Sequence, residues 1–389
     1  MKQLAITVLS LAFALPLGVW DLPAAQAQEE VSIGEPKELL ETPEMMIPPS
    51  ETTNADLLPE TRPLLSETLR EKKFLEGIEI IPGVVLSGLL EVEANYGVLN
   101  QDEGKAEQSS DLNLATFELG VDIDLIKYLH GHFLLLWEEG DGEPIDLDEG
   151  IITLGAEEDF PYFLSVGKMY LPFGVFESHF ISDPLTLELG ESRETALLLG
   201  IELDLFSAAV GAYRGEIEKT GQDTRIDTLV AALDFTPMDG LVAGISYLNN
   251  IADTNGLAEF LPEGEVSDYV GGISAYFNLK TGPFTLSGEY LGALEKFRDI
   301  PAPDRSDLEG KEPKTWNLEV TYLFPGENWE AALRYEGSSD FPGFPIGQGG
   351  ICLSWGFLPN TTVSAEYLYA EFKNDDRRNL VAAQLAFEF

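Results

Sequence analysis

The sequence predicts an all-β protein, a transmembrane antiparallel up-and-down β-barrel of about 16 strands, set in a bacterial outer membrane. Three observations predict this fold. Apolar and polar residues alternate from about residue 84 to residue 389, the connections between these segments are alternately short and long, and aromatic residues stand near the segment ends. An even number of strands with short turns on one side and long loops on the other is typical of outer-membrane barrels.

The N-terminal segment, residues 1–27, has the pattern of a secretory signal peptide. Lys2 precedes an apolar stretch that ends at Ala25-Gln26-Ala27. A basic start, an apolar middle and a small-residue cleavage site define such signals. Residues 28–80 are rich in Pro, Glu and Thr, which predicts a mostly disordered periplasmic extension with a short helix. A plug inside the barrel is the alternative for this segment.

The barrel is expected over residues 81–389, where apolar residues that recur at every second position define the strands. In Trp329–Tyr335, Trp329, Ala331, Leu333 and Tyr335 alternate with Glu330, Ala332 and Arg334. Period two places each set on one face of a strand. Sixteen such strands are predicted to start near residues 84, 112, 130, 150, 162, 195, 206, 226, 240, 268, 283, 314, 328, 346, 361 and 379.

The alternative fold is a soluble all-β protein with several sandwich domains. Apolar faces would then pack against each other, and aromatic residues at strand ends would have no role. The last strand, "LVAAQLAFEF", ends on Phe389, which looks like the assembly signal of outer-membrane barrels. These features favour the barrel, with membrane lipid, lipopolysaccharide and the barrel assembly machinery as partners.

Composition narrows the function. The chain has 389 residues and a formal net charge of -45, which argues against nucleic acid as a partner. The three histidines, His130, His132 and His179, belong to no hydrolase or metalloprotease motif. "HGH" at 130–132 offers two ligands without a third, so no metal, no cofactor and no catalytic residue is predicted, and the protein is not expected to be an enzyme.

The inward faces of the predicted strands carry many carboxylates. A ring of about 16 strands is wide enough for an aqueous channel, and carboxylates there would favour cations. Arg334 is one of few inward cations. The candidate acidic residues of the lumen are Glu91, Glu93, Glu118, Asp122, Glu202, Asp204, Glu289, Glu319 and Glu366.

The third long loop follows the fifth predicted strand and reads "LPFGVFESHFISDPLTLELGESRE". Its prolines limit flexibility, and its apolar residues predict packing on the barrel wall or on other loops. We expect it to fold into the pore and narrow it; the alternative is a surface loop that tethers a neighbouring subunit or lipopolysaccharide. The candidate constriction residues are Lys168, Glu177, His179, Asp183, Glu188, Glu191 and Arg193. Lys168 faces either inward or toward lipid.

"VGKMYLPFGVFESHFISDPLTLELGESRETALLLG" resembles the LbtU-type siderophore porin family, and "GK-x-x-x-PFG" is reminiscent of phosphate- and carbohydrate-type porins. The first resemblance covers about residues 80–389 and implies passive uptake of a ferric siderophore as the small solute. An acidic lumen would repel an anionic siderophore, so the solute would be neutral or cationic, or the loop's basic groups would relay it. The alternatives are a general or cation-preferring diffusion porin, a barrel enzyme and an adhesive barrel. A homotrimer is compatible with such a pore, but no sequence feature indicates it.

Overall fold

A computed structural model describes residues 77–102, 104–139, 145–157, 159–222, 225–261, 264–301, 306–326 and 328–389. The predicted signal peptide, 1–27, and nearly all of the predicted extension, 28–80, lie outside the described residues. Strand structure begins at β1, Ile78–Ile81, within the last residues assigned to the extension. β1 pairs antiparallel with the strand that follows it, β2.

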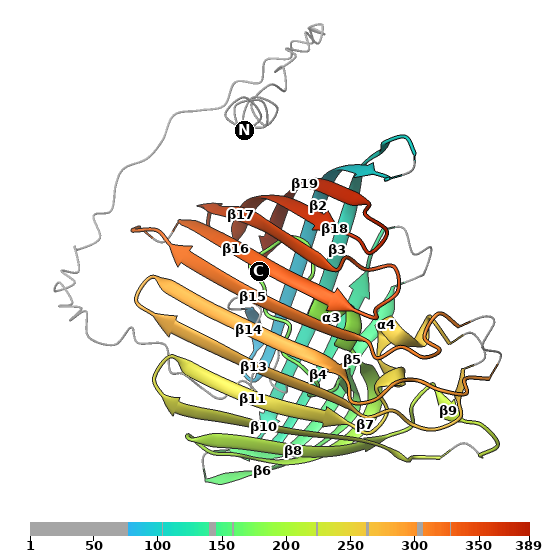
Figure 1. The fold of residues 1–389 in the computed structure, drawn as a ribbon. Helices are drawn as coiled ribbons and strands as arrows, with labels where there is room; N and C mark the ends of the chain where they lie inside the picture. Colours follow the sequence, from blue (N-terminus) through green and yellow to red (C-terminus); the bar gives the residue numbers. More distant parts are fainter. Residues whose placement is uncertain are drawn as a thin grey trace, which may run out of the picture. The chain divides into compact units, whose positions relative to one another are not determined.

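Sixteen strands form one closed antiparallel barrel, as predicted (Figure 1). β19 pairs with β2, for example at Val92 and Leu385, and this pairing closes the ring. The strands are β2 (Val84–Asn100), β3 (Glu107–Ile126), β4 (Leu129–Trp137), β5 (Asp146–Glu157), β6 (Phe160–Tyr170), β7 (Arg193–Glu202), β8 (Phe206–Tyr213), β10 (Thr228–Met238), β11 (Leu241–Leu248), β13 (Gly272–Thr281), β14 (Phe284–Ala293), β15 (Lys314–Leu323), β16 (Trp329–Ser339), β17 (Gly347–Leu358), β18 (Thr361–Glu371) and β19 (Arg377–Glu388).

The sequence periodicity places these strands well because one face of each is apolar. The largest displacement is at β3, which begins at Glu107 rather than near residue 112. On β7, Leu197 and Leu199 are 43% and 51% exposed on the outside, whereas Leu198 between them is 0% exposed. An outer surface of exposed leucines suits lipid and not water, so the apolar faces are not paired as they would be in a sandwich.

Aromatic side chains form a belt at the strand ends that carry the short turns. The rings of Trp329 and Trp355 stack with centroids 5.1 Å apart, and Phe284 contacts Tyr322 at 4.9 Å. At the opposite strand ends, Trp316 contacts Tyr335 at 5.0 Å. Aromatic rings at both ends of an apolar band mark the two interfaces of a membrane.

Short helical segments lie in the long loops: α3 (Leu185–Gly190), η1 (Ile251–Asp253) and α4 (Asn255–Ala258). Among the described residues, no helix is long and apolar enough to cross a membrane. A parallel pair, β9 (Glu218–Lys219) and β12 (Glu265–Val266), joins the fourth and fifth long loops.

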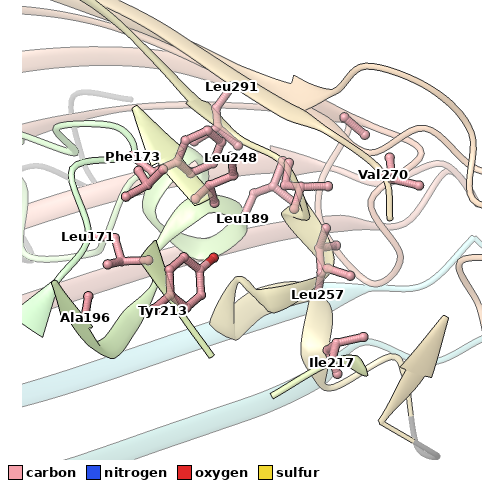
Figure 2. Packing of buried hydrophobic residues seen from close by; sticks show 14 of the residues in the cluster. Leu171, Phe173, Leu189, Ala196, Tyr213, Ile217, Leu248, Leu257, Val270 and Leu291 are labelled. Carbon is pink, nitrogen blue, oxygen red and sulfur yellow. The ribbon is translucent and has the colours of Figure 1, made fainter. Parts of the chain in front are cut away.

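A buried hydrophobic cluster joins these loops to the inner wall of the barrel. Figure 2 shows Leu171, Phe173 and Leu189 of the third long loop within the same cluster as Leu248 and Leu291 of the wall. Burial of such side chains stabilises the arrangement by about 1.5–3 kcal/mol each. The third loop is therefore packed on the wall and does not stand free in water.

Candidate functional site

The third long loop, residues 171–192, connects β6 to β7 and lies against the inside of the barrel (Figure 1). Leu171 and Phe173 are buried at its start. Gly174 has φ +89°, and a Cβ there would lie 2.4 Å from the ring of Phe176. A side chain at 174 would be strained, so this glycine permits the turn into the lumen.

Four glutamates of the wall hold the loop by accepting hydrogen bonds from its backbone. The first is Glu289 on β14, whose Oε1 accepts from the N–H of Val175 at 2.9 Å and whose Oε2 accepts from Phe176 at 3.1 Å. Ser274 donates its hydroxyl to the same carboxylate. Hydrogen bonds to a charged acceptor contribute about 1.5–3 kcal/mol each, so the carboxylate fixes this part of the loop.

Glu319 on β15 holds the next segment. Its carboxylate accepts from the Ser178 hydroxyl and from the His179 N–H, each at 2.9 Å, and lies 2.8 Å from His179 Nδ1. Burial lowers the pKa of His179, but the hydrogen bond to Glu319 and the charges of Glu330 and Glu319 outweigh it, so the pKa is raised. The imidazole is thereby biased toward its charged form beside the wall carboxylate.

Glu366 on β18 and Glu336 on β16 hold the segment before α3. Glu366 Oε2 accepts from the N–H groups of Ile181 and Ser182 at 2.8 and 3.0 Å. Glu336 Oε2 accepts from Leu185 N–H at 2.7 Å. Leu185 begins α3, where backbone N–H groups lack helical partners, so Glu336 supplies one of them with an acceptor.

Arg334 on β16 binds the same segment of the loop by donating hydrogen bonds to loop oxygens. Its Nη1 donates to the Ser178 hydroxyl at 3.0 Å and to Ser182 O at 2.8 Å. Its Nε pairs with Glu336 at 3.0 Å, and both side chains are 0% exposed. The guanidinium also lies 4.4 Å from the ring centroid of Phe180. The Arg334 guanidinium is therefore buried by its contacts with the loop and with Glu336, and it is not accessible to a solute.

The fifth long loop covers α3 from the other side. Asn255 donates its backbone N–H to Glu191 O at 2.8 Å and its side-chain amide to the Glu191 carboxylate at 3.0 Å. A Cβ on Gly256 would lie 1.8 Å from Glu188 O. Only glycine allows this approach, so the two loops meet backbone to backbone.

The exposed side chains on the loop are acidic. Glu177, Asp183 and Glu188 are exposed within the barrel, and Glu191 is half-buried. The surrounding wall and loop partly exclude bulk water from Glu177 and so raise its pKa, although Asn278 donates to its carboxylate at 2.5 Å. The surrounding wall and loops partly exclude bulk water from Glu188, and together with the charges of Asp183 and Glu191 this raises its pKa to about 7. Glu188 is therefore only partly ionised around neutral pH, although its side chain is exposed in the lumen.

The loop's other two predicted basic residues lie at its two ends. Lys168 shares a strand face with Val166, which is 44% exposed, and its Nζ donates to Asp146 at 3.1 Å and to Leu147 O at 2.9 Å. Arg193 hydrogen-bonds Asp148 and Asp146. Lys168 and Arg193 therefore link β6 and β7 to β5 where the loop leaves the wall. The structure does not place either of them beside His179.

The nine candidate acidic residues of the lumen divide into three groups. Glu289, Glu319 and Glu366 lie on the inner wall, but they are buried beneath the loop and do not face open water. Asp204 lies beyond β7 in an exposed short turn rather than on a strand. The remaining five lie on strands with half-buried side chains: Glu91, Glu93, Glu118, Asp122 and Glu202.

Sequence reasoning did not identify Arg334 and Glu336 as loop partners. The only signal was an isolated arginine on an inward face among carboxylates. His130 and His132 pair with Asp124 and Asp122 at 2.5 and 2.8 Å. Among the described residues, no group of three or more histidine, cysteine or acidic side chains has metal-binding geometry.

A closed barrel of sixteen antiparallel strands, with an apolar outer band and two aromatic belts, defines a bacterial outer-membrane β-barrel of the porin type. The chain lies in the bacterial outer membrane, with lipid against its outer face.

Comparison of the sequence with known proteins finds distant relatives. No protein-family model matches the chain. A UPF0422 protein of Coxiella burnetii is 26% identical over 277 residues, 67% of this chain and 58% of the relative. UPF0422 protein lpg2959 of Legionella pneumophila is 22% identical over 282 residues, 65% and 52% of the two chains. The chain thus spans little more than half the length of these curated relatives.

Solved structures with the same fold include an outer-membrane channel. The channel DcaP of Acinetobacter baumannii superposes with a TM-score of 0.59 at 15% identity, over 81% of this chain and all of the other. Salmonella typhi OmpF, solved with daunomycin, gives 0.55 at 11% identity over 80% of this chain and 100% of its own. OprB of Pseudomonas putida gives 0.52 at 14% identity over 79% and 94%. These likenesses show the fold.

Proposed function

We propose that the protein is a porin, a passive channel for small solutes whose water-filled lumen is narrowed by the third long loop. The observation that carries this proposal is the row of four wall carboxylates, Glu289, Glu319, Glu336 and Glu366, that binds the backbone of the loop inside the barrel. A loop fixed at this position narrows the lumen. Passage past it requires neither a chemical reaction nor a bound cofactor.

The charges around the loop support a preference for cations. Arg334 is buried among loop and wall groups, and Arg193 is paired with Asp148. The loop's exposed side chains at 177, 183 and 188 are carboxylates. Because fixed carboxylates in a narrow aqueous path concentrate cations and repel anions, we propose that neutral and cationic solutes pass in preference to anions.

A ferric siderophore as the particular solute rests on the resemblance to the LbtU-type siderophore porins. The acidic loop favours a siderophore complex that is neutral or cationic over an anionic one. Lipopolysaccharide and the barrel assembly machinery as partners likewise remain predictions from the sequence. A homotrimeric state is compatible with such a pore, although no sequence feature indicates it.

Liposome swelling tests passive passage. Proteoliposomes containing the full chain should swell in small uncharged sugars, and more slowly as the sugar grows, because the loop sets the bore. Empty liposomes and liposomes with heat-denatured protein serve as controls. The same vesicles can report entry of a labelled ferric siderophore. Absence of swelling in the smallest sugar would overturn the channel, whereas exclusion of the siderophore alone would remove only that solute.

A further inference from the structure

A small pocket lies between the third long loop and the inner wall formed by β13, β14 and β15. Val175, Phe176 and Glu177 of the loop form one side of this pocket, which we call the Glu177 pocket. The polar residues on its wall side include Asn278, Ser287 and Asn317. Its inner space holds a group about the size of one or two water molecules. The pocket therefore admits a small polar head group and is too narrow for a sugar ring.

The backbone of the third loop directs Glu177 to this pocket. Phe176 has φ +58°, a left-handed conformation that is rare for a bulky side chain. The loop keeps this conformation because the Glu289 carboxylate accepts hydrogen bonds from the N–H groups of Val175 and Phe176. Backbone conformations of this kind are concentrated at binding sites. The backbone of Glu177 is thereby fixed at the pocket, while its side chain is exposed in the lumen.

The oxygen atoms of the pocket residues lack donors. Asn278 Nδ2 donates to Glu177 Oε2 at 2.5 Å, so the amide oxygen of Asn278 remains an acceptor. Asn317 is 6% exposed, and within the described part of the chain its Oδ1 has no hydrogen-bond partner. The Ser287 hydroxyl can accept as well. Because a buried acceptor without a donor is costly, the pocket favours a ligand that carries several N–H or O–H groups.

The charge of the pocket favours a cation over water. Glu177 and Glu289 both line it, and none of the described residues that line it is basic. The charge of His179 acts on Glu177, but its imidazole Nδ1 lies 2.8 Å from Glu319. Glu289 is already bound to loop N–H groups, so Glu177 is the carboxylate that a solute can reach. A primary ammonium group combines three N–H donors with a positive charge on a small head, and it matches these acceptors in size and sign.

We propose that the Glu177 pocket binds the primary ammonium group of a cationic solute as the solute passes the third loop. This inference rests on the proposed porin function and names a class of solute, the aliphatic primary amines. The ammonium group would donate to the Glu177 carboxylate, with Asn317 Oδ1 and the Ser287 hydroxyl as further acceptors. The half-buried side chains of Val175 and Phe176 would contact the alkyl chain. Tetramethylammonium carries the same charge without an N–H donor, so it should bind far more weakly.

Saturation-transfer NMR on the purified full chain in an uncharged detergent tests the pocket without requiring a conducting channel. Propylammonium is the probe, and wild-type protein should bind it saturably. Propan-1-ol has nearly the same shape without the charge, and it and tetramethylammonium should each bind about tenfold or more weakly. Equal binding of either compound would overturn the proposal, since the pocket would then recognise only polarity or only charge. Passage through the lumen is tested separately by the swelling of proteoliposomes in sugar.

Three variants place the probe in the pocket. Glu177→Gln keeps the size of an exposed side chain, so it should fold as a barrel and bind propylammonium about tenfold or more weakly. Ser287→Ala removes one acceptor and should weaken binding several-fold. Glu259→Gln is the matched control, because Glu259 is exposed in the fifth long loop and does not line the pocket; it should retain wild-type affinity. Circular dichroism should show the strand content of wild type in all three variants. Absence of saturable binding in wild type, or wild-type affinity in both pocket variants, would overturn the proposal.

Discussion

Deleting residues 176–187 should increase the single-channel conductance several-fold. This segment supplies most of the backbone groups that bind Glu289, Glu319, Glu336 and Glu366. Its removal returns those carboxylates to lumen water and takes away the packed residues that lie across the interior. The strands do not depend on this segment, because β6 and β7 pair directly from Tyr162–Ile201 to Tyr170–Arg193.

Planar-bilayer recording gives the measurement, and a short deletion elsewhere gives the control. Removing residues 104–106 from the loop between β2 and β3 shortens an exposed connection and should leave the conductance near that of wild type. Equal conductance in wild type and the 176–187 deletion would mean that the third loop does not set the bore.

Arg334→Met should release the third loop from the wall. The guanidinium donates to the Ser178 hydroxyl and to the Ser182 carbonyl and pairs with Glu336, and its side chain is 0% exposed. Removing one partner of a buried pair costs about 3–5 kcal/mol, because the other charge remains buried and unpaired. Arg334→Lys keeps the charge but loses the planar fork, so its effect should be intermediate.

Limited proteolysis within the third loop, with denaturant unfolding in detergent, measures this release. Arg377→Met is the matched control, since Arg377 is 62% exposed and lies 4.0 Å from its partner Glu371. It should behave as wild type because exposed pairs contribute little. If Arg334→Met is as protease-resistant as Arg377→Met, the buried arginine does not hold the loop.

The strands could be predicted from sequence because a barrel wall imposes a strict period. Trp329, Leu333 and Tyr335 were assigned to one face, and all three are exposed outward. The same period assigned Glu319 and Glu366 to the inner face, where they lie. Periodicity depends only on neighbours along the chain. It therefore predicted which face of the strand each of these residues lies on, but not which residues they contact.

The loop contacts could not be predicted because backbone N–H groups have no sequence signature. Ile181 donates to Glu366, 185 positions away, and any residue except proline could supply that donor. For the same reason Glu289, Glu319 and Glu366 were interpreted as channel-lining acids, although the loop covers them. Lys168 and Arg193 stood out by charge alone, and their carboxylate partners on β5 became visible only with the strand register.

The reversal potential of the wild-type channel in a KCl gradient tests the central claim most directly. At about pH 8, carboxyl groups with a pKa near 7 such as Glu188 are mostly ionised. We predict discrete conductance steps and a reversal potential whose sign shows that potassium is more permeant than chloride. A preference for chloride would contradict the acidic path beside the third loop, and absence of conductance steps would contradict the channel itself.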